Sequence, residues 1–416
     1  PGLQRVHGWG NEDIKIVIKA MAETGLEGVY SMGDDTPVAI LGRTPRRVYN
    51  YLRRRFAQVT NPPIDSLRER FVMSLRVVLG PRVSMSGLPE RKPAPPPLLE
   101  LESPIVGAGE LKRILETGLV LDATFGEKET LRGALERLCA AAEAAEDGIL
   151  VLSDRSTSRH RLPVPMLLAV GAVHERLLQR GVRLRKDLIA LAGDAIDVHD
   201  MAMLISTGAA AVHPYLGFAT ARTVLEEGKE PQDAENAYRK ALESGLLKVM
   251  AKMGISCVAS YCGAQVFEAL GLGAEVMEIC LPGVPSRVGG ADFADLEAVI
   301  REHHEAAWTA EESPPDHGRV RFRKAGEWHA HNPLAVRQLQ KAARSGDPAA
   351  YATYKEMADM GRPAALRNLL DFRSGMVPVE LDEVEPVEAI HPRFIAASVR
   401  LGGLSPEPHL AIALAQ

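Results

Sequence analysis

The chain has 416 residues, 46% of them hydrophobic and 25% charged, and a formal net charge of -5. This length predicts two domains, or one large α/β domain with an extension, and the negative charge excludes a general nucleic-acid binder, which needs a basic surface. No apolar run reaches the roughly 18 residues of a membrane span, and the 4 cysteines are too few for a disulfide scaffold. A reducing, cytoplasmic setting is therefore expected. The start has no signal-peptide layout, and the missing initiator Met and helix-like final residues indicate a piece of a longer protein.

Two short apolar runs, residues 28–31 and 37–41, flank a polar turn at residues 33–36. The adjacent carboxylates of Asp34 and Asp35 would suit a metal site or acid–base chemistry. Turn chemistry offers a simpler interpretation, in which these side chains cap backbone groups. We therefore favour a structural turn.

Residues 44–56 predict a helix. Thr44 and Pro45 suit an N-cap and a first helical turn, and apolar side chains recur at helical spacing as far as Phe56. The segment also contains Arg46, Arg47, Arg53, Arg54 and Arg55. A solvated helix face explains this cluster more simply than an anion site does.

A rigid corner follows that helix. Two prolines come directly after Asn61, and because proline cannot donate a backbone hydrogen bond the helix must end there. Ser66 and Glu69 form a capping box for a second helix. Its predicted apolar face consists of Leu67, Phe71, Leu75 and Val78. Such a corner would hold Thr60 and Asn61 in a fixed geometry, although an ordinary interhelix turn is the alternative.

After a Pro-rich loop or linker at residues 81–97, helices alternate with short apolar strands from residue 103 onward. The predicted helices are residues 110–116, 130–146, 165–180, 199–206 and 234–253, and the predicted strands are residues 149–152, 188–192, 210–212 and 257–260. Continuously apolar strands joined by helices are typical of a parallel sheet that is buried on both faces. The expected fold class is α/β, with parallel β/α repeats in an incomplete or irregular TIM-type barrel.

Several residues in this region have the chemistry of metal ligands. The best grouped are Asp197, His199 and Asp200. The sequence shows no further ligand at a distance, so a helix cap or core packing is the simpler interpretation. The other candidates are His303, His304, His329 and His331, which we interpret as surface histidines. No metal site is predicted.

The cysteines and glycines offer weaker signals. Cys257, Cys262 and Cys280 are most simply small core residues, with a thiol nucleophile at Cys262 as an alternative. Gly271, Gly273, Gly289 and Gly290 could cradle a phosphate near Ser286 and Arg287, but no complete phosphate-loop or dinucleotide fingerprint is present.

Several motifs resemble the central domain of the glutamate synthase large subunit. The first two are S-M-G-D-D-T-P at residues 31–37 and F-A-Q-V-T-N-P-P-I-D at residues 56–65. Further matches are I-L-V-L-S-D-R at residues 149–155, G-L-L-K-V-M-A-K-M-G-I-S at residues 245–256 and P-S-R-V-G-G at residues 285–290. The chain departs from the family at residues 190–200, at His213, where the family has asparagine, and at Cys262, where it has arginine.

Beyond a second linker, the chain resembles the start of the family's flavin-binding domain. R-K-A-G-E-W-H-A-H-N-P at residues 323–333 matches the entry into that domain, and helices are predicted at residues 333–344 and 349–360. Residues 393–409 align with the first strand and loop of the FMN barrel, a second and truncated β/α barrel. In that alignment Arg400 stands where the family has serine. The residues that the resemblance implies for FMN binding are Val399, Gly402, Gly403 and Ser405.

The resemblance implies a central domain at residues 1–310, a linker at 311–333 and a truncated FMN-binding domain at 334–416. The complete family enzyme makes L-glutamate from L-glutamine and 2-oxoglutarate. It uses FMN and a [3Fe-4S] cluster whose cysteines lie beyond Gln416. This chain alone is expected to bind neither cofactor and to contain no catalytic residue.

The implied role of this chain is to connect active sites and to form part of an ammonia-channel wall. The residues assigned to that channel or to a domain interface are Thr60, Asn61, Asp34 and Asp35. The implied partners are a glutamine amidotransferase domain, the rest of the FMN domain, and either an NADPH-dependent small subunit or ferredoxin as electron donor. Neither nucleic acid nor a membrane is an expected partner.

Two other functions remain open from the sequence. One is a non-catalytic scaffold or binding module that diverged from the synthase. The other is an independent β/α-barrel enzyme, with a site at the strand ends built on Asp154, Asp197 and His213.

Overall fold

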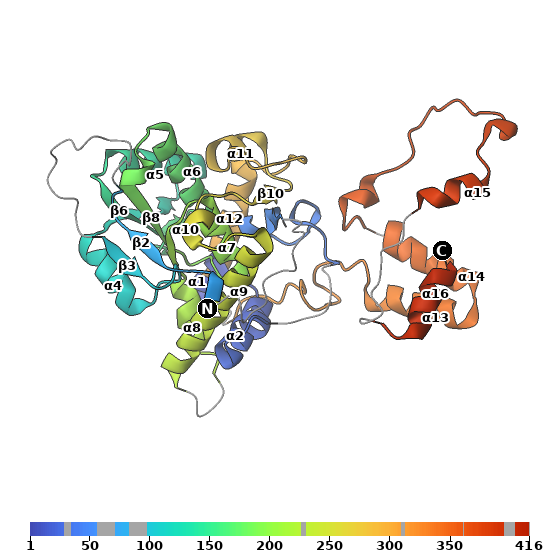
Figure 1. Ribbon diagram of the computed structural model, residues 1–416, viewed down its shortest axis with the longest axis horizontal. Coiled ribbons are helices and arrows are strands. Elements are labelled where there is room, and N and C mark those ends of the chain that lie inside the picture. The colour runs from blue at the N-terminus through green and yellow to red at the C-terminus, as the bar shows by residue number, and fades with distance from the viewer. Residues whose placement is uncertain are drawn as a thin grey trace. The chain divides into compact units, whose positions relative to one another are not determined.

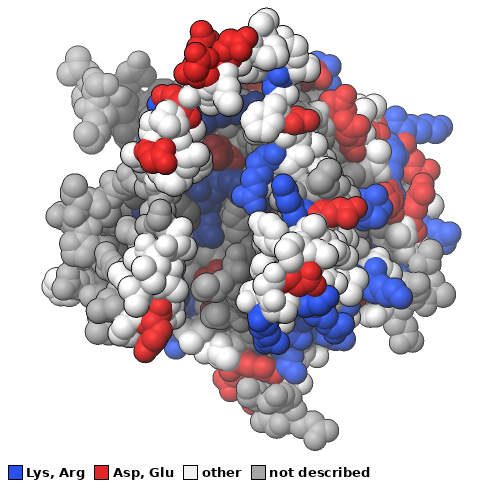
Figure 2. Space-filling view, turned by 90° about the vertical axis from the view of Figure 1, so that its right-hand side faces the viewer, with Lys and Arg blue, Asp and Glu red and all other residues white. Residues whose placement is uncertain are grey.

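The computed structural model describes residues 1–28, 35–55, 71–82, 98–225, 230–308, 313–360, 362–394 and 404–415. Its contacts divide the chain into two compact units, Pro1–Asn368 and Leu369–Gln416 (Figure 1). Within the described ranges, no helix combines the length and the apolar character needed to cross a membrane. Figure 2 shows acidic and basic side chains interspersed over the described part of one face, in keeping with the small net charge.

A parallel sheet forms the centre of the first unit. Its strands are β4 (Leu119–Asp122), β6 (Gly148–Ser153), β8 (Lys186–Leu191) and β9 (Ala211–His213), in the order β4-β6-β8-β9. All three pairings are parallel, with Leu150 opposite Leu188 and Ala190 opposite Val212. Residues 104–106 continue the sheet beyond β9, because Val106 N–H donates to the Val212 carbonyl and Val212 N–H donates to the Pro104 carbonyl. Every residue of β8 is buried, as expected for a strand covered on both faces.

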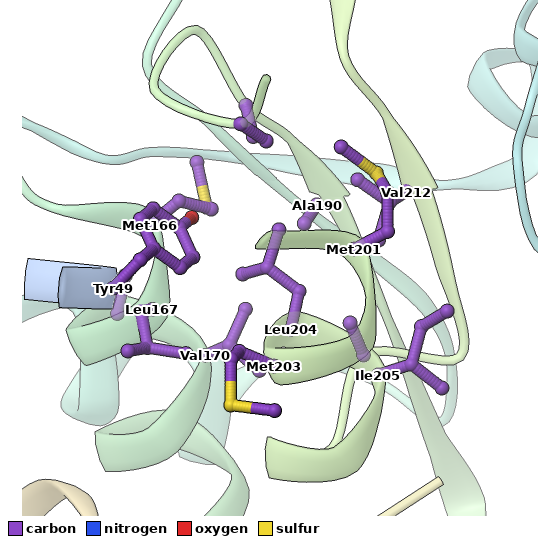
Figure 3. Close-up of a cluster of buried hydrophobic side chains, with 14 of the residues drawn as sticks. Tyr49, Met166, Leu167, Val170, Ala190, Met201, Met203, Leu204, Ile205 and Val212 are labelled. Carbon is purple, nitrogen blue, oxygen red and sulfur yellow. The ribbon is translucent and has the colours of Figure 1, made fainter. Parts of the chain in front are cut away.

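Helices connect the strands of this sheet and cover it (Figure 1). They are α4 (Ala108–Thr117), α5 (Leu131–Ala144), α6 (Met166–Gln179), α7 (Val198–Thr207) and α8 (Tyr215–Ala221), followed by the long helix α9 (Pro231–Met253). Figure 3 shows how side chains from α6 and α7 meet those from the strands in one cluster. Met166, Leu167 and Val170 of α6 are fully buried there, as are Leu204 of α7 and Ala190 of β8.

The remaining elements of the first unit lie outside the parallel sheet and the helices named above. The helices and helical turns are α1 (Gly2–Val6), η1 (Asp13–Ile18), α2 (Lys19–Thr24), η2 (Ala39–Leu41), η3 (Val48–Tyr51), η4 (Arg183–Arg185), α10 (Val258–Tyr261), α11 (Ala274–Cys280), α12 (Phe293–Ala307), α13 (Pro333–Ser345), α14 (Pro348–Lys355), η5 (Glu356–Met360) and η6 (Leu366–Leu369), which crosses the unit boundary. Three antiparallel pairs complete this unit: β1 (Leu52–Arg54) with β10 (Phe267–Ala269), β2 (Val77–Leu79) with β3 (Leu99–Leu101), and β5 (Thr124–Gly126) with β7 (Arg161–Pro163).

The second unit, Leu369–Gln416, has little regular structure in its described part. Its elements are η7 (Leu381–Glu383), α15 (Val387–Ile390), η8 (His391–Arg393) and α16 (Pro406–Ala415). Most of its apolar side chains are exposed, including Phe372 at 97% and Val377 at 86%. This unit therefore buries little apolar surface within itself.

The predicted α/β class with a parallel sheet is confirmed, and the predicted helices between residues 110 and 253 and at residues 333–344 and 349–360 are found within a few residues. A complete barrel is not seen in the described residues. The parallel sheet there has four strands, and residues 104–106 add only an isolated bridge, Ile105 to Val212.

Three local predictions are wrong. The described part of residues 44–56 forms the turn η3 and the strand β1, because Leu52–Arg54 pairs with distant residues of β10. In the second predicted helix, residues 71–72 are helical, but the predicted apolar face is wrong, because Phe71 is 91% exposed and Val78 lies in strand β2. Residues 257–260, predicted as a strand, instead begin the short helix α10. For β1 and β2, pairing with distant strands outweighs the local pattern.

Candidate functional site

Polar side chains gather where the parallel strands end. Asp154 follows β6 directly, Asp194 lies shortly after β8, and Tyr215 lies shortly after β9. Carboxyl ends of parallel strands share one edge of a sheet, which is where α/β folds place ligand sites. Segments from the start of the chain cover this edge and contribute His7 and Arg47.

Asp154 is the centre of the first group and has no exposed surface. Its carboxylate accepts a 2.9 Å hydrogen bond from Gly193 N–H and another from the Tyr215 hydroxyl. His7 Nδ1 lies 3.9 Å from the carboxylate, and His7 Nε2 lies 3.4 Å from the Tyr215 oxygen. Burial, reinforced by the nearby Asp194 charge, raises the pKa of Asp154 well above its usual value. Burial also lowers the pKa of His7 to about 3, so the imidazole beside Asp154 is neutral at pH 7.

Gly193 makes this arrangement sterically feasible. A Cβ atom at this position would lie 2.3 Å from His7 Nε2 and 2.6 Å from the Tyr215 hydroxyl. The Gly193 carbonyl is used as well, since it accepts a 3.0 Å hydrogen bond from Trp9 Nε1. A side chain here would therefore separate the groups that surround Asp154.

Asp194 and Asp200 form a second group around Arg47. The Arg47 guanidinium donates to the Asp194 carbonyl at 2.7 Å and to the Asp200 carboxylate at 2.5 Å. The Asp194 carboxylate accepts 3.0 Å hydrogen bonds from the Tyr49 hydroxyl and from Met166 N–H. Burial raises the pKa of Asp200 to about 8, although the adjacent Arg47 guanidinium opposes that rise. The guanidinium and the carboxyl remain in direct contact inside the protein, so this group is not an exposed acid–base pair.

Arg47 lines two cavities of very different size. A cavity of about 40 Å³ is lined by His7, Arg47, Asp194 and His303 together with apolar side chains, which is room for about one water molecule. A second cavity, of about 670 Å³, is also lined by Arg47; we call it the arginine cavity. A third, of about 630 Å³, is lined by His213, Arg155 and Tyr215 among others.

The structure describes one of the residues predicted for the ammonia channel or domain interface. Asp35 lines the arginine cavity. Its carboxylate bonds His329 Nδ1 at 2.8 Å and accepts a 2.8 Å hydrogen bond from His331 N–H. It caps a backbone group, as predicted, but one that lies far along the chain and not in its own turn. Asp34, Thr60 and Asn61 lie outside the described residues.

The helix-cap interpretation of the Asp197 group is confirmed. Asp197 is the N-cap of α7, and its side chain accepts a hydrogen bond from Asp200 N–H. His199 Nε2 bonds the Tyr49 carbonyl oxygen at 3.0 Å. Within the described residues, no three His, Cys, Asp or Glu side chains are placed to bind a metal ion together.

The prediction of surface histidines is wrong for two of them. His304 is buried and bonds the Ser158 carbonyl oxygen at 2.8 Å. His329 is also buried, between Asp35 and the Gly318 carbonyl. Their burial comes from segments distant in the chain, which local sequence does not show.

The cysteines do not form a reactive site. Cys280 is buried, as predicted for a core residue, whereas Cys257 and Cys262 are half-buried. Burial raises the pKa of the Cys262 thiol, and this residue ends helix α10 instead of a strand. A nucleophilic thiolate is disfavoured under these conditions. These cysteines, with Cys139, also do not fit a [3Fe-4S] cluster, because no described group of three ligands exists.

Two of the glycines proposed for a phosphate loop, Gly271 and Gly290, serve close packing. Gly271 has φ +93°, and a Cβ there would lie 2.6 Å from Ile40 Cβ. A Cβ on Gly290 would lie 2.3 Å from the Gly271 carbonyl oxygen. Both glycines therefore let two loops and Ile40 approach each other.

Of the residues predicted to bind FMN, the structure describes Ser405, which is exposed just before helix α16. Its hydroxyl bonds Glu407 and lowers the pKa of that carboxyl. Val399, Gly402 and Gly403 lie outside the described residues, as does Arg400. The described residues therefore do not by themselves form a flavin site.

Sequence reasoning missed most of the buried network. His7, Arg47, Tyr49 and Tyr215 carry no local motif, because they become a group only when the start of the chain folds over the sheet. Asp194 could have been found, since it lies in the segment that departs from the family and follows a predicted strand.

Comparison with known proteins identifies the family. The model of the glutamate synthase central domain matches residues 2–273, and that of the conserved region in glutamate synthase matches residues 329–416. The chain belongs to the glutamate synthase family. Ferredoxin-dependent glutamate synthases of Pyropia yezoensis and Spinacia oleracea are both 38% identical over 99% of this chain. Ferredoxin-dependent glutamate synthase 2 of Arabidopsis thaliana is 39% identical over 99% of it.

This member of the glutamate synthase family spans only 28% of the Pyropia protein and 27% of the Spinacia protein. Among solved structures, the flavin-binding domain of baker's yeast flavocytochrome b2 aligns with 44% of this chain and 43% of its own, at 18% identity and a TM-score of 0.27. That likeness is too weak to carry an argument.

We expect His7 to make folding sensitive to acid. The unfolded imidazole takes up a proton near pH 6.5, whereas the folded one does so only near pH 3. Stability from this group is thus complete above pH 6.5 and is lost as the pH falls toward 3. When the pH is lowered from 7.5 to 5.5, the free energy of unfolding of the wild type should fall by about 1.4 kcal/mol more than that of His7→Gln.

Urea unfolding at the two pH values measures this difference. His160→Gln, which removes a largely exposed histidine, is the matched control. An identical pH dependence for the wild type and His7→Gln would show that His7 is not kept neutral by burial.

Proposed function

We propose that this chain is the connecting part of a glutamate synthase, an oxidoreductase that makes L-glutamate from L-glutamine and 2-oxoglutarate. The observation that carries the proposal is the pair of family matches, at residues 2–273 and 329–416, with 38% identity over nearly the whole chain. The proposed boundaries are a central domain at residues 1–310, a linker at 311–333 and the start of the FMN-binding domain at 334–416.

The proposed role of the chain is structural: it holds neighbouring active sites in register and forms part of the wall of an ammonia channel. Asp34, Asp35, Thr60 and Asn61 are the residues proposed to face that channel or a domain interface. Support comes from Asp35, which lines a cavity and is held in place by His329 and His331. A wall built from fixed groups excludes bulk water from a path for ammonia.

The proposal includes partners that lie outside this chain. They are a glutamine amidotransferase domain and the rest of the FMN domain, since the relatives are more than three times as long as the matched region. Ferredoxin is the electron donor that the names of the relatives favour; nothing supports an NADPH-dependent small subunit.

FMN, when bound, would supply the electron transfer. Val399, Gly402, Gly403 and Ser405 are proposed to contact it, and the [3Fe-4S] cluster is assigned to cysteines outside this chain. The proposed setting is cytoplasmic, although the spinach relative is named chloroplastic.

Substituting Asn61 in the full-length enzyme tests the channel. We expect Asn61→Ala to raise the ratio of glutamine hydrolysed to 2-oxoglutarate consumed by about two-fold or more, because a leaking wall releases ammonia to solvent. The ratio is measured with reduced ferredoxin by quantifying free ammonia and glutamate. Asn236→Ala, an exposed change on α9, is the control.

An unchanged ratio for Asn61→Ala would remove Asn61 from the channel wall. Absence of glutamine-dependent glutamate formation by the wild-type enzyme, with either electron donor, would overturn the proposed function as a whole.

The independent barrel enzyme is not favoured. Asp154 has no exposed surface and cannot touch a substrate, and Asp197 is engaged as a helix cap. His213 is buried, and its Nδ1 bonds the Val106 carbonyl oxygen at 2.6 Å. Asp154, Asp197 and His213 thus each have a separate structural role.

A further inference from the structure

The arginine cavity contains more charge than its neighbours. Its volume is about 670 Å³, within the range of small-molecule sites. The cationic residues that line it are Arg46, Arg47, Arg319 and Arg321. The anionic residues are Asp13, Asp35 and Asp197. Whether the cavity attracts anions or cations depends on which of these groups already have partners.

All three carboxylates are engaged within the protein. Asp13 accepts a 2.7 Å hydrogen bond from Gly10 N–H. Asp35 is bonded by His329 and by His331 N–H, and Asp197 caps helix α7. Backbone N–H groups and an imidazole therefore already bond these three carboxylates.

Arg46 and Arg47 already pair with the carboxylates of Glu327 and Asp200, whereas Arg319 and Arg321 form no ion pair with a described residue. The Nε of Arg47 is buried and has no hydrogen-bond partner among the described residues, and the Arg47 side chain is only 8% exposed. Arg319 donates to Thr44 Oγ1 and to the Pro45 carbonyl. Arg321 lines the cavity, and its guanidinium has no hydrogen bond or ion pair with any described residue.

Arg319 lies beside two other cations, Arg46 and Arg47. The pKa of Arg319 is lowered to about 10, first by burial and then by the charges of Arg46 and Arg47. Burial and the Arg319 charge likewise lower the pKa of His303 and of His317 to about 4. Repulsion of this kind is relieved when an anion occupies the space between the cations.

We propose that the arginine cavity binds a small dianion, with Arg321 and Arg319 as the main contacts. Guanidinium groups recognise carboxylate and phosphate oxygens through paired, charge-assisted hydrogen bonds. Phosphate and short dicarboxylates share that chemistry. This assignment replaces the solvated-face interpretation for Arg46 and Arg47, which are buried or nearly so. It does not depend on the proposed function.

Calorimetric titration of the full 416-residue chain tests the site. Inorganic phosphate and malonate are titrated in separate arms, with acetate as a monoanion control, at low ionic strength because salt screens such binding. We expect saturable binding of at least one dianion, and the tighter arm identifies its class. Arg321→Gln should weaken that binding roughly tenfold, the effect of losing a charge-assisted hydrogen bond, and Arg321→Lys should restore part of it.

Arg337→Gln is the matched control, since it removes an equal charge from an exposed position on α13. Equal weakening by Arg337→Gln would mean that net charge alone causes binding, and would overturn the proposal. So would the absence of saturable binding by either dianion. Binding by this chain that disappears in the full-length enzyme would also overturn it, because another domain would then occupy the cavity.

Discussion

Replacing Arg47 by methionine is expected to lower the free energy of unfolding by about 3–5 kcal/mol. The guanidinium is the charged partner of Asp200 at 2.5 Å, and the two side chains are 8% and 1% exposed. Methionine has similar length but no charge, so it would leave the Asp200 carboxyl buried without a cation. The Asp194 carbonyl would lose a 2.7 Å hydrogen bond as well. Urea unfolding followed by circular dichroism measures the loss.

A second substitution separates the ion pair from simple packing. Arg47→Met combined with Asp200→Asn should recover about 1–2 kcal/mol relative to Arg47→Met alone, because the remaining partner is then neutral. Arg53→Met is the matched control, since Arg53 belongs to the same arginine cluster but is exposed. If Arg53→Met costs as much as Arg47→Met, the buried ion pair is not what stabilises this edge of the sheet.

Two substitutions of Asp154 are expected to have different effects on the free energy of unfolding at pH 7. Burial raises the pKa of its carboxyl well above the usual value, so Asp154→Asn, which keeps the shape and cannot ionise, should be at least as stable as the wild type. Asp154→Ala should be about 2–3 kcal/mol less stable than Asp154→Asn, because Gly193 N–H and the Tyr215 hydroxyl lose their acceptor. Chemical unfolding of the three proteins measures both differences.

The pH dependence provides a further check on Asp154. Its folded pKa is raised, so the stability it contributes is complete below its ordinary value of 3.8 and is lost as the pH rises. The advantage of Asp154→Asn over the wild type should therefore grow as the pH rises above 3.8. A large loss of stability in Asp154→Asn at pH 7 would mean that the carboxyl is ionised.

Local patterns were sufficient where each element buries an apolar face against its sequence neighbours. Helices α5, α6 and α9 and strands β6 and β8 were predicted within a few residues because strong periodicity or a continuous apolar run marks each of them. The cap at Asp197 was also predictable, since N-capping depends on residues only three apart.

Local patterns failed where partners are distant in the chain. Residues 44–56 have helical spacing, yet Leu52–Arg54 forms a strand because β10, more than 200 residues later, supplies its hydrogen-bond partners. His304 and His329 looked like surface residues, but Ser158 and Asp35 bury them from far away in the sequence. No window of neighbouring residues contains that information.

By itself, the sequence determined the order of β/α units, the family and the capping of individual helices. The reason is that periodicity, motifs and caps depend on residues that are close together in the chain. Only the tertiary structure decided that His7 meets Asp154, that Arg47 pairs with Asp200, and that arginines from separate segments line one cavity. The physical reason is that burial sets the charge state and the partner of each of these groups. Burial depends on which distant segments fold over the carboxyl edge of the sheet.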